Sequence, residues 1–282
     1  MKKIISLLSA IIMMAACLTA CGSSSNASAM TSVTTSEPVE LVVFAAASMT
    51  ETLTEIGSMY TAVHPEVSLI FNFDSSGTLK TQIQEGAVCD LFISAGQKQM
   101  NELDITADAA VNTEGLNFVL EGSRINLLEN KIVLVVPEAN PADINRFDDM
   151  AAGLEAGSIL MAIGNSDVPV GQYTQKILTF YSLDEAVLAA AGVLSYGTNV
   201  KEVTTQVSEG TVDCGVVYAT DAFSAGLTVV EEATTDMCGK AIYPAALMNT
   251  TAHTNEAQAF LNFLQTSEAM AIFEKVGFQA AP

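Results

Sequence analysis

The stretch Leu41–Glu55, LVVFAAASMTETLTE, joins an apolar run to a helical pattern through three alanines and a serine. The apolar run has the length and β-branching of a buried strand, which we expect from Val39 to Phe44. From residue 48 to 63, apolar residues recur at the spacing of an amphipathic helix. A strand that runs directly into a helix indicates an α/β fold.

The serine at this junction has two roles open to it. Ser48 and Glu51 have the spacing of a capping box, in which the two side chains satisfy N–H groups at a helix start. The alternative is that the Ser48 hydroxyl faces a ligand. The spacing alone does not decide between the two roles.

The rest of the chain continues the alternation of strands and helices, without an internal repeat. We expect strands at 67–73, 90–95, 131–137, 159–163, 212–219 and 242–248, and helices at 76–85, 171–180, 200–208, 254–264 and 267–275. A polar stretch before Lys131 is expected to be a crossover.

The N-terminal region predicts export and lipid attachment. Residues 1–20 have the basic start and apolar core of a signal peptide. Leu18–Gly22, LTACG, resembles the lipobox of bacterial lipoproteins, and the competing Cys17 has no linker after it. We therefore expect lipid on Cys21, a flexible Ser/Thr-rich tether over 21–38, and an extracytoplasmic protein held at the cell membrane.

The charge balance limits the partners of the chain. Acidic residues outnumber basic ones by 32 to 11, and the formal net charge is −21. We therefore exclude nucleic acid as a partner. An acidic surface also repels small anions at long range, so any anion site must bind through strong local groups.

The chain offers little material for catalysis. Its two histidines, His64 and His253, lie in polar surroundings, and no nucleophile elbow, zinc-binding pair or phosphate-binding loop occurs. We expect no enzymatic activity and no cofactor. Cys89, Cys214 and Cys238 lack the spacing of a metal site, so we expect small core residues, with one disulfide among them left open.

Four helix starts follow small, hydroxyl or glycine residues, at Ser48, Ser76, Val170 and Val200. The first turn of a helix has N–H groups without intrahelical partners and a partial positive charge, so it binds anions without a cationic side chain. Taken singly, each start is also explained as an ordinary helix cap. Only if the four starts met would they form a strong anion site.

Seven segments together resemble the molybdate-binding proteins of ABC transporters, in order and spacing along nearly the whole mature chain. They are FAAASMTETLTEI, FNFDSSGTLKTQIQEG, CDLFISAGQKQM, VPVGQYTQKIL, the helix from Val200, GVVYATDA and IYPAALM. The resemblance implies an extracytoplasmic receptor that binds molybdate, or tungstate, and delivers it to the transmembrane subunits of an ABC permease. We expect it to act as a monomer.

The resemblance also implies the fold. The family has a two-lobed periplasmic binding protein fold of type II, in which each lobe is a mixed sheet flanked by helices. The ligand lies in the cleft between the lobes. We expect the first lobe at 40–129 and 240–282, and the second at 130–239.

Carried over position by position, the resemblance implies five ligand-binding residues. Ser48 and Ser76 would offer hydroxyl and backbone N–H groups, Val170 and Val200 would offer backbone N–H groups, and Tyr218 would donate its phenol hydrogen. Molybdate is fully deprotonated near neutral pH, so its oxygens only accept hydrogen bonds. Neutral donors satisfy these oxygens without a buried cation, and no residue is expected to ligate a metal ion directly.

Two features depart from this pattern or complicate it. The loop Gly164–Pro169 is one residue shorter than the G-D-P-x-x-V-P pattern of the family, and Asn165 replaces its acid. Asp74, beside the paired serines, could accept a proton from a phosphate-like ligand. We expect it instead to be a turn residue that faces solvent.

Other functions remain as alternatives. The nearest is a receptor for another tetrahedral oxyanion such as sulfate, which charge alone does not exclude. A ferric-iron receptor is less favoured, because ferric iron is bound by several anionic ligands and we expect one tyrosine, Tyr218, at the cleft. A hydrolase would need a nucleophile–base pair, and a signalling ectodomain would need a C-terminal span. The sequence favours neither.

Overall fold

The computed structural model describes residues 38–282, which belong to one compact unit. The predicted signal peptide, Cys21 and the predicted tether up to residue 37 lie outside the described residues. Among the helices of 38–282, none is both long enough and apolar enough to cross a membrane.

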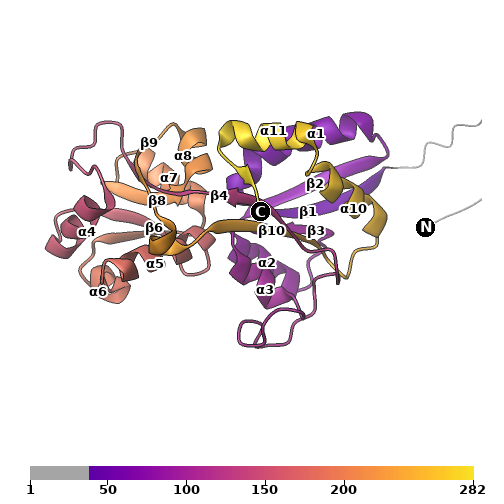
Figure 1. The fold of residues 1–282 in the computed structure, drawn as a ribbon, viewed down its shortest axis with the longest axis horizontal. Coiled ribbons are helices and arrows are strands. Elements are labelled where there is room, and N and C mark those ends of the chain that lie inside the picture. The colour runs from indigo at the N-terminus through magenta and orange to yellow at the C-terminus, as the bar shows by residue number, and fades with distance from the viewer. Residues whose placement is uncertain (1–37) are drawn as a thin grey trace, which may run out of the picture. The chain divides into compact units, whose positions relative to one another are not determined.

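A first sheet of six strands has the order β11-β4-β10-β3-β1-β2 (Figure 1). Its strands are β1 (Val39–Ala46), β2 (Val67–Asp74), β3 (Leu91–Ile93), β4 (Ile125–Asn130), β10 (Ala241–Leu247) and β11 (Gln279–Ala280). β1 is parallel to both β2 and β3. β10 runs antiparallel to β3 and β4, so the sheet is mixed.

Helices cover both faces of the first sheet, as Figure 1 shows. They are α1 (Thr50–Val63), α2 (Ser76–Gln84), α3 (Gln97–Leu103), α10 (Thr254–Phe263) and α11 (Ser267–Val276). On one face Leu41 and Val43 belong to the same apolar cluster as Leu53 of α1. On the other face Phe44 clusters with Leu79 of α2. Because both faces are buried, the strand is a continuous apolar run instead of an alternating one.

A second sheet of five strands has the order β7-β6-β8-β5-β9. Its strands are β5 (Ile132–Val136), β6 (Met161–Gly164), β7 (Leu194–Gly197), β8 (Cys214–Tyr218) and β9 (Thr228–Glu232). β6 is parallel to β7 and β8, whereas β5 is antiparallel to β8 and β9. The associated helices are α4 (Phe147–Ala156), α5 (Pro169–Phe180), α6 (Glu185–Ala190), α7 (Val200–Ser208), α8 (Ala219–Ala225) and α9 (Thr235–Cys238).

We use first lobe and second lobe for the two sheets with their helices. The chain passes from the first sheet to the second across a single residue between β4 and β5, and returns through α9 into β10. The crossover therefore lies where it was expected, but the stretch before Lys131 is not a polar connection. It is strand β4, because Leu127 and Leu128 are buried in the core and β10 and β11 both pair with the strand.

Candidate functional site

The three mutually parallel strands of each lobe end at one small pocket between the lobes. The pocket has a volume of about 10 Å³. It is lined by Ala46, Ala47, Ser48, Asp74, Ser75, Ser76 and Ala95 of the first lobe and by Val168, Pro169, Val200 and Tyr218 of the second. Four of the five residues predicted to bind a ligand are thus brought together, and Val170 is not in the lining.

Helix starts supply most of this lining. α2 begins at Ser76, α5 at Pro169 and α7 at Val200, while α1 follows a short 3₁₀ turn at Ala47–Met49. Backbone N–H groups in the first turn of each helix have no intrahelical acceptor and favour negative charge. No lysine or arginine lines the pocket, so the donors that line it are neutral groups.

Ser76 is placed to donate into the pocket. Its side chain is fully buried, and its Oγ accepts a hydrogen bond from the Ala95 N–H at 2.9 Å. The hydroxyl hydrogen is therefore not consumed by that bond. The neighbouring Ser75 has a different role, because its Oγ accepts from Thr78 N–H and caps α2.

Ser48 lies at the end of a chain of polar side chains that the sequence did not predict. The Asn130 amide donates to the Tyr243 hydroxyl at 3.2 Å, and that hydroxyl is 3.0 Å from Ser48 Oγ. Asn130 Oδ1 accepts from Lys131 N–H, which fixes the orientation of its amide. The Tyr243 hydrogen is then free to point to Ser48, and the Ser48 hydrogen is free to point into the pocket.

Tyr243 remains a neutral donor in this chain, because burial raises the pKa of its phenol well above the usual value. The segment IYPAALM contains Tyr243, but its apolar neighbours indicate only a buried strand. Neither periodicity nor spacing could show that the phenol meets a serine almost two hundred positions away.

The capping box that the spacing of Ser48 and Glu51 allows does not form. Met49 is the N-cap of α1, with no side-chain cap, because the 3₁₀ turn moves the helix start beyond Ser48. The Glu51 carboxylate instead pairs with the Lys201 ammonium at 2.9 Å. Ser48 therefore does not cap α1. α7, in contrast, has an ordinary side-chain cap, since Asn199 Oδ1 accepts from Glu202 N–H.

Helix α5 begins two residues before the predicted start at Gly171. Pro169 occupies its first position, where the missing N–H group costs nothing and the fixed φ suits the helix. Val170 is consequently in the first turn and fully buried, but the pocket wall at this helix is formed by Val168 and Pro169.

Tyr218 joins the two lobes. Its hydroxyl donates to the carbonyl oxygen of Ala95 at 3.1 Å, and burial raises the pKa of the phenol well above its usual value. A phenol has one hydrogen to donate. Any ligand oxygen that received it would compete with the Ala95 carbonyl.

Other contacts show that the cleft is closed. A Cβ atom added to Gly77 of α2 would overlap the carbonyl oxygen of Asp167 in the second lobe. At Gly96 an added Cβ would lie 3.2 Å from Pro169 Cβ. Glycine at these positions therefore lets the first lobe approach the backbone of the second.

A buried carboxylate lies behind the pocket. Asp221 of α8 is 1% exposed, and neither of its oxygens has a hydrogen-bond partner. Lys201 Nζ lies 3.6 Å from Oδ1 and also pairs with Glu51 across the cleft. Burial raises the pKa of Asp221 to about 7, although Lys201 opposes this shift.

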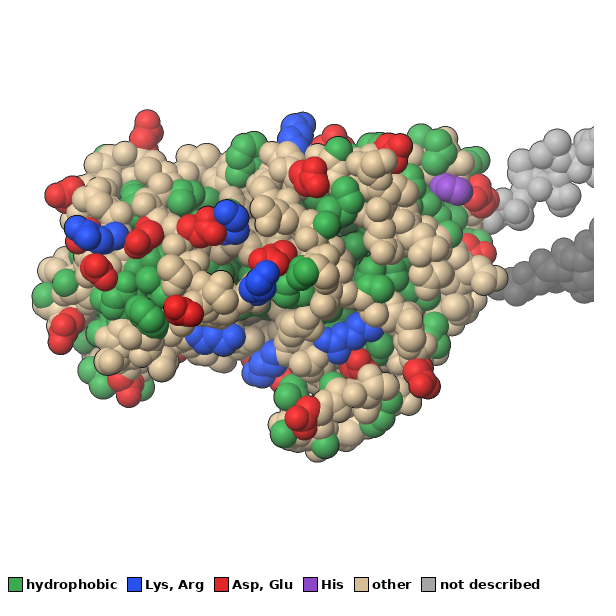
Figure 2. All heavy atoms as spheres, viewed as in Figure 1, with side chains coloured by type: hydrophobic (Ala, Val, Ile, Leu, Met, Phe, Trp, Pro, Cys, Tyr) green, Lys and Arg blue, Asp and Glu red, His purple; other side chains and the backbone are tan. Residues whose placement is uncertain are grey.

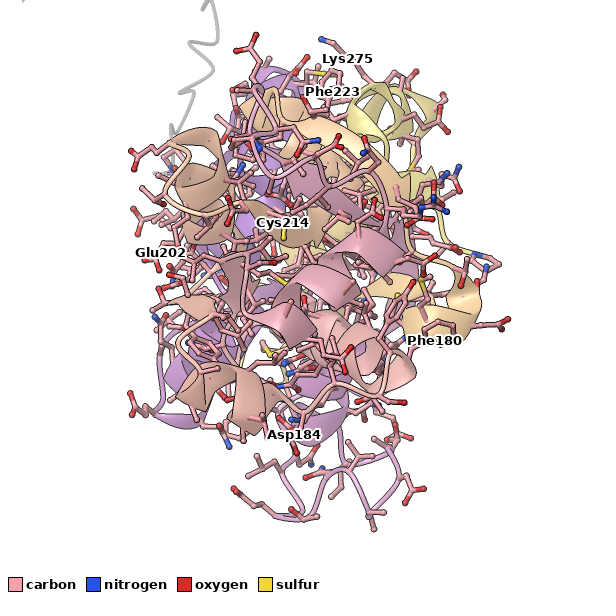
Figure 3. The ribbon with its side chains drawn as sticks, turned by 90° about the vertical axis from the view of Figure 1, so that its left-hand side faces the viewer. Phe180, Asp184, Glu202, Cys214, Phe223 and Lys275 are labelled. Atoms are coloured by element: carbon pink, nitrogen blue, oxygen red, sulfur yellow. The ribbon has the colours of Figure 1, made fainter. Side chains whose placement is uncertain are left out.

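The remaining titratable groups indicate no metal centre. Cys89, Cys214 and Cys238 are free and buried, so no disulfide forms among them. Figure 3 shows Cys214 in the interior of the second lobe, whereas Asp184 and Glu202 lie at its periphery. Among residues 38–282, no group of three or more His, Cys, Asp or Glu side chains could hold a metal ion.

The sequence matches one protein family and several named proteins over most of its length. The family described as bacterial extracellular solute-binding protein matches residues 41–279. Bacillus subtilis YvgL, named as an ABC transporter substrate-binding lipoprotein, is 36% identical over 260 residues, covering 92% of each chain. The molybdate-binding protein ModA of Mycobacterium tuberculosis is 30% identical over 267 residues, covering 94% of each.

The fold also has a close counterpart among solved structures. The periplasmic molybdate-binding protein of Azotobacter vinelandii matches with a TM-score of 0.71 and 22% identity. The match covers 86% of this chain and all of that one. At this identity the likeness concerns the fold.

Asp221→Asn should change how stability depends on pH. The unfolded chain ionises Asp221 near pH 4, whereas the folded protein keeps its proton until about pH 7. The parent therefore loses stability as pH rises through this window, by at most about 1.4 kcal/mol per pH unit. The advantage of the variant in thermal midpoint should grow from pH 4 to 7 and then stay constant.

Thermal unfolding from pH 4 to 8 measures this difference. Asp236→Asn, at an exposed position of α9, is the matched control and should show no such growth. A difference between Asp221→Asn and the parent that is the same at every pH would contradict the buried, protonated state of Asp221.

Proposed function

Since this chain belongs to the family of bacterial extracellular solute-binding proteins, we propose that it binds molybdate between its lobes and delivers it to an ABC permease. Membership of the family confirms the predicted two-lobed binding-protein fold and the expectation that the chain is not an enzyme. The observation that carries the proposal is the pocket where helix starts from both lobes meet without a cationic side chain.

The donor set fits a fully deprotonated tetrahedral anion. Ser76 Oγ accepts from Ala95 N–H, and Ser48 Oγ can accept from the Tyr243 hydroxyl, so each serine can offer a hydrogen to the pocket. The starts of α2 and α7 add backbone N–H groups. An anion whose oxygens only accept is satisfied by such groups, and tungstate has the same requirements as molybdate.

Two relatives support the assignment and the location. ModA of Mycobacterium tuberculosis is named for molybdate binding, and YvgL is named as a lipoprotein. We therefore propose that lipid on Cys21 holds the protein outside the cytoplasm at the cell membrane, where it meets the transmembrane subunits of the permease. We propose that one copy of the chain suffices for binding, because its two lobes supply both sides of the pocket.

A receptor for another oxyanion is the second candidate, and Asp74 is the observation that favours it. The expectation that Asp74 faces solvent is wrong, because it lines the pocket and is partly buried. One carboxylate oxygen accepts from Ser75 N–H at 2.7 Å. The other could accept from a protonated anion such as hydrogen phosphate, whereas molybdate and sulfate have no proton to donate to it. Sulfate is a dianion like molybdate, so only the size of the pocket separates them.

Calorimetric titration with molybdate, tungstate, sulfate and phosphate tests the function. Molybdate and tungstate should bind most tightly. Ser76→Ala should weaken molybdate binding by about 1–3 kcal/mol, because it removes a buried donor. Ser58→Ala, on the exposed side of α1, is the control and should leave affinity unchanged. Tight binding of sulfate or phosphate without molybdate would contradict the assignment, and full affinity in Ser76→Ala would remove Ser76 from the site.

Closure around the ligand gives a separate prediction. Molybdate contacts both lobes, so it should favour the closed state, and small-angle X-ray scattering should show a smaller radius of gyration after it is added. Gly77→Val places a side chain against the Asp167 carbonyl and should prevent this compaction while the protein remains folded.

The control for closure is Thr81→Val, an exposed position on the same helix, which should compact as the parent does. Compaction of Gly77→Val to the radius of gyration of the parent would show that the Gly77 contact does not limit closure. Circular dichroism verifies that each variant is folded.

A further inference from the structure

A groove beside the pocket collects an unusual share of the basic side chains of the protein. It has a volume of about 590 Å³ and is lined by the start of α3, by one face of α5 and by Lys240 before β10. Its lining includes Lys98, Lys176 and Lys240 and no carboxylate. We call it the lysine groove. Figure 2 shows basic side chains gathered on this face, over the region where α3 and α5 face each other in Figure 1.

The three ammonium groups remain available to an anion. Among residues 38–282, Lys176 has no carboxylate partner; it lies 3.4 Å from the Cys238 carbonyl oxygen and over the ring of Tyr173. Lys98 and Lys240 pair with Glu102 and Glu129, but their side chains are 57% and 54% exposed. The glutamates are 21% and 22% exposed, but each pair is open to solvent on its lysine side, where the ammonium group can contact an anion in the groove.

The groove and the pocket share a wall. Ala95 lines the pocket and the adjacent Gly96 lines the groove. On the second lobe, Pro169 lines the pocket, and Tyr173, one turn further along α5, lines the groove. The Tyr173 and Tyr218 rings meet edge to face with centroids 6.3 Å apart. An anion held in the groove is thus beside the place where the lobes separate.

This arrangement answers a difficulty that the composition creates. The chain carries a net charge of −21, which repels a dianion at a distance. The donors in the pocket are neutral and buried, so they attract an anion only at short range. The positive charges of the lysine groove, next to the cleft, would offset this repulsion of a dianion at the entrance to the pocket.

We propose that the lysine groove captures oxyanions from solution and guides them into the adjacent pocket. This inference rests on the proposed function and adds a role for Lys98, Lys176 and Lys240 in the rate of binding. Electrostatic steering of this kind raises association rates by about 10- to 1000-fold and weakens as salt screens the charges. The lysines are outside the lining of the pocket, so the dissociation rate should not depend on them.

Stopped-flow measurement of molybdate binding at low ionic strength tests the proposal. The triple variant Lys98→Gln, Lys176→Gln, Lys240→Gln should bind at least about tenfold more slowly than the parent, with a dissociation rate within about twofold. The difference should shrink at about 0.5 M salt. The matched control is Arg146→Glu, Lys275→Gln, which changes the net charge equally at positions outside the groove and should associate nearly as fast as the parent.

The outcomes separate this inference from the function on which it rests. If the groove variant and the charge-matched control associated equally slowly, net charge, and not the groove, would set the association rate. That result would overturn the proposal. An unchanged association rate, or an effect confined to dissociation, would overturn it too while the receptor function stands. If the parent bound no molybdate at all, the proposed function itself would fail.

Discussion

The structure depends on one constraint: a bare dianion taken out of water needs a hydrogen-bond donor for each oxygen, and buried cations are a costly way to provide one. Here the donors come from the backbone and from hydroxyl groups. Three parallel strands in each lobe end at the same pocket, so the helices that follow begin there with their free N–H groups. Parallel topology in both sheets is therefore what creates the proposed anion site.

The serines add direction to this arrangement. Ser76 accepts a hydrogen bond from Ala95 N–H, and Ser48 Oγ lies within hydrogen-bonding distance of the Tyr243 hydroxyl, which can donate to it. With these bonds in place, each serine hydrogen is free to point into the pocket. Such groups need little reorganisation when an anion arrives. The Asp74 carboxylate of the first lobe works in the opposite sense, because it lines the pocket and repels an anion.

Much of the fold could be predicted from local pattern, because buried parallel strands are continuous apolar runs and most helix starts carry small or hydroxyl residues. Strand β4 could not, since its pairing with β10 and β11 joins distant segments. The short strands β7 and β9 were also missed, but for another reason. They lie at the edges of the second sheet, with a neighbouring strand on one side only, so they are less buried and lack an apolar run.

The resemblance predicted which residues would lie together, but not which contacts they would make. The resemblance placed Ser48, Ser76, Val200 and Tyr218 at a common ligand, and the structure brings these four to one pocket. It did not reveal that Tyr218 donates to Ala95 across the cleft, or that Pro169 starts α5 ahead of Val170. These depend on how two lobes meet, which no local spacing encodes.

The most direct test of the central claim is a crystal structure with molybdate, measured at the molybdenum absorption edge. The account predicts one strong anomalous peak inside the pocket, within hydrogen-bonding reach of Ser48, Ser76 and the start of α7. A peak only in the lysine groove, or none between the lobes, would contradict it.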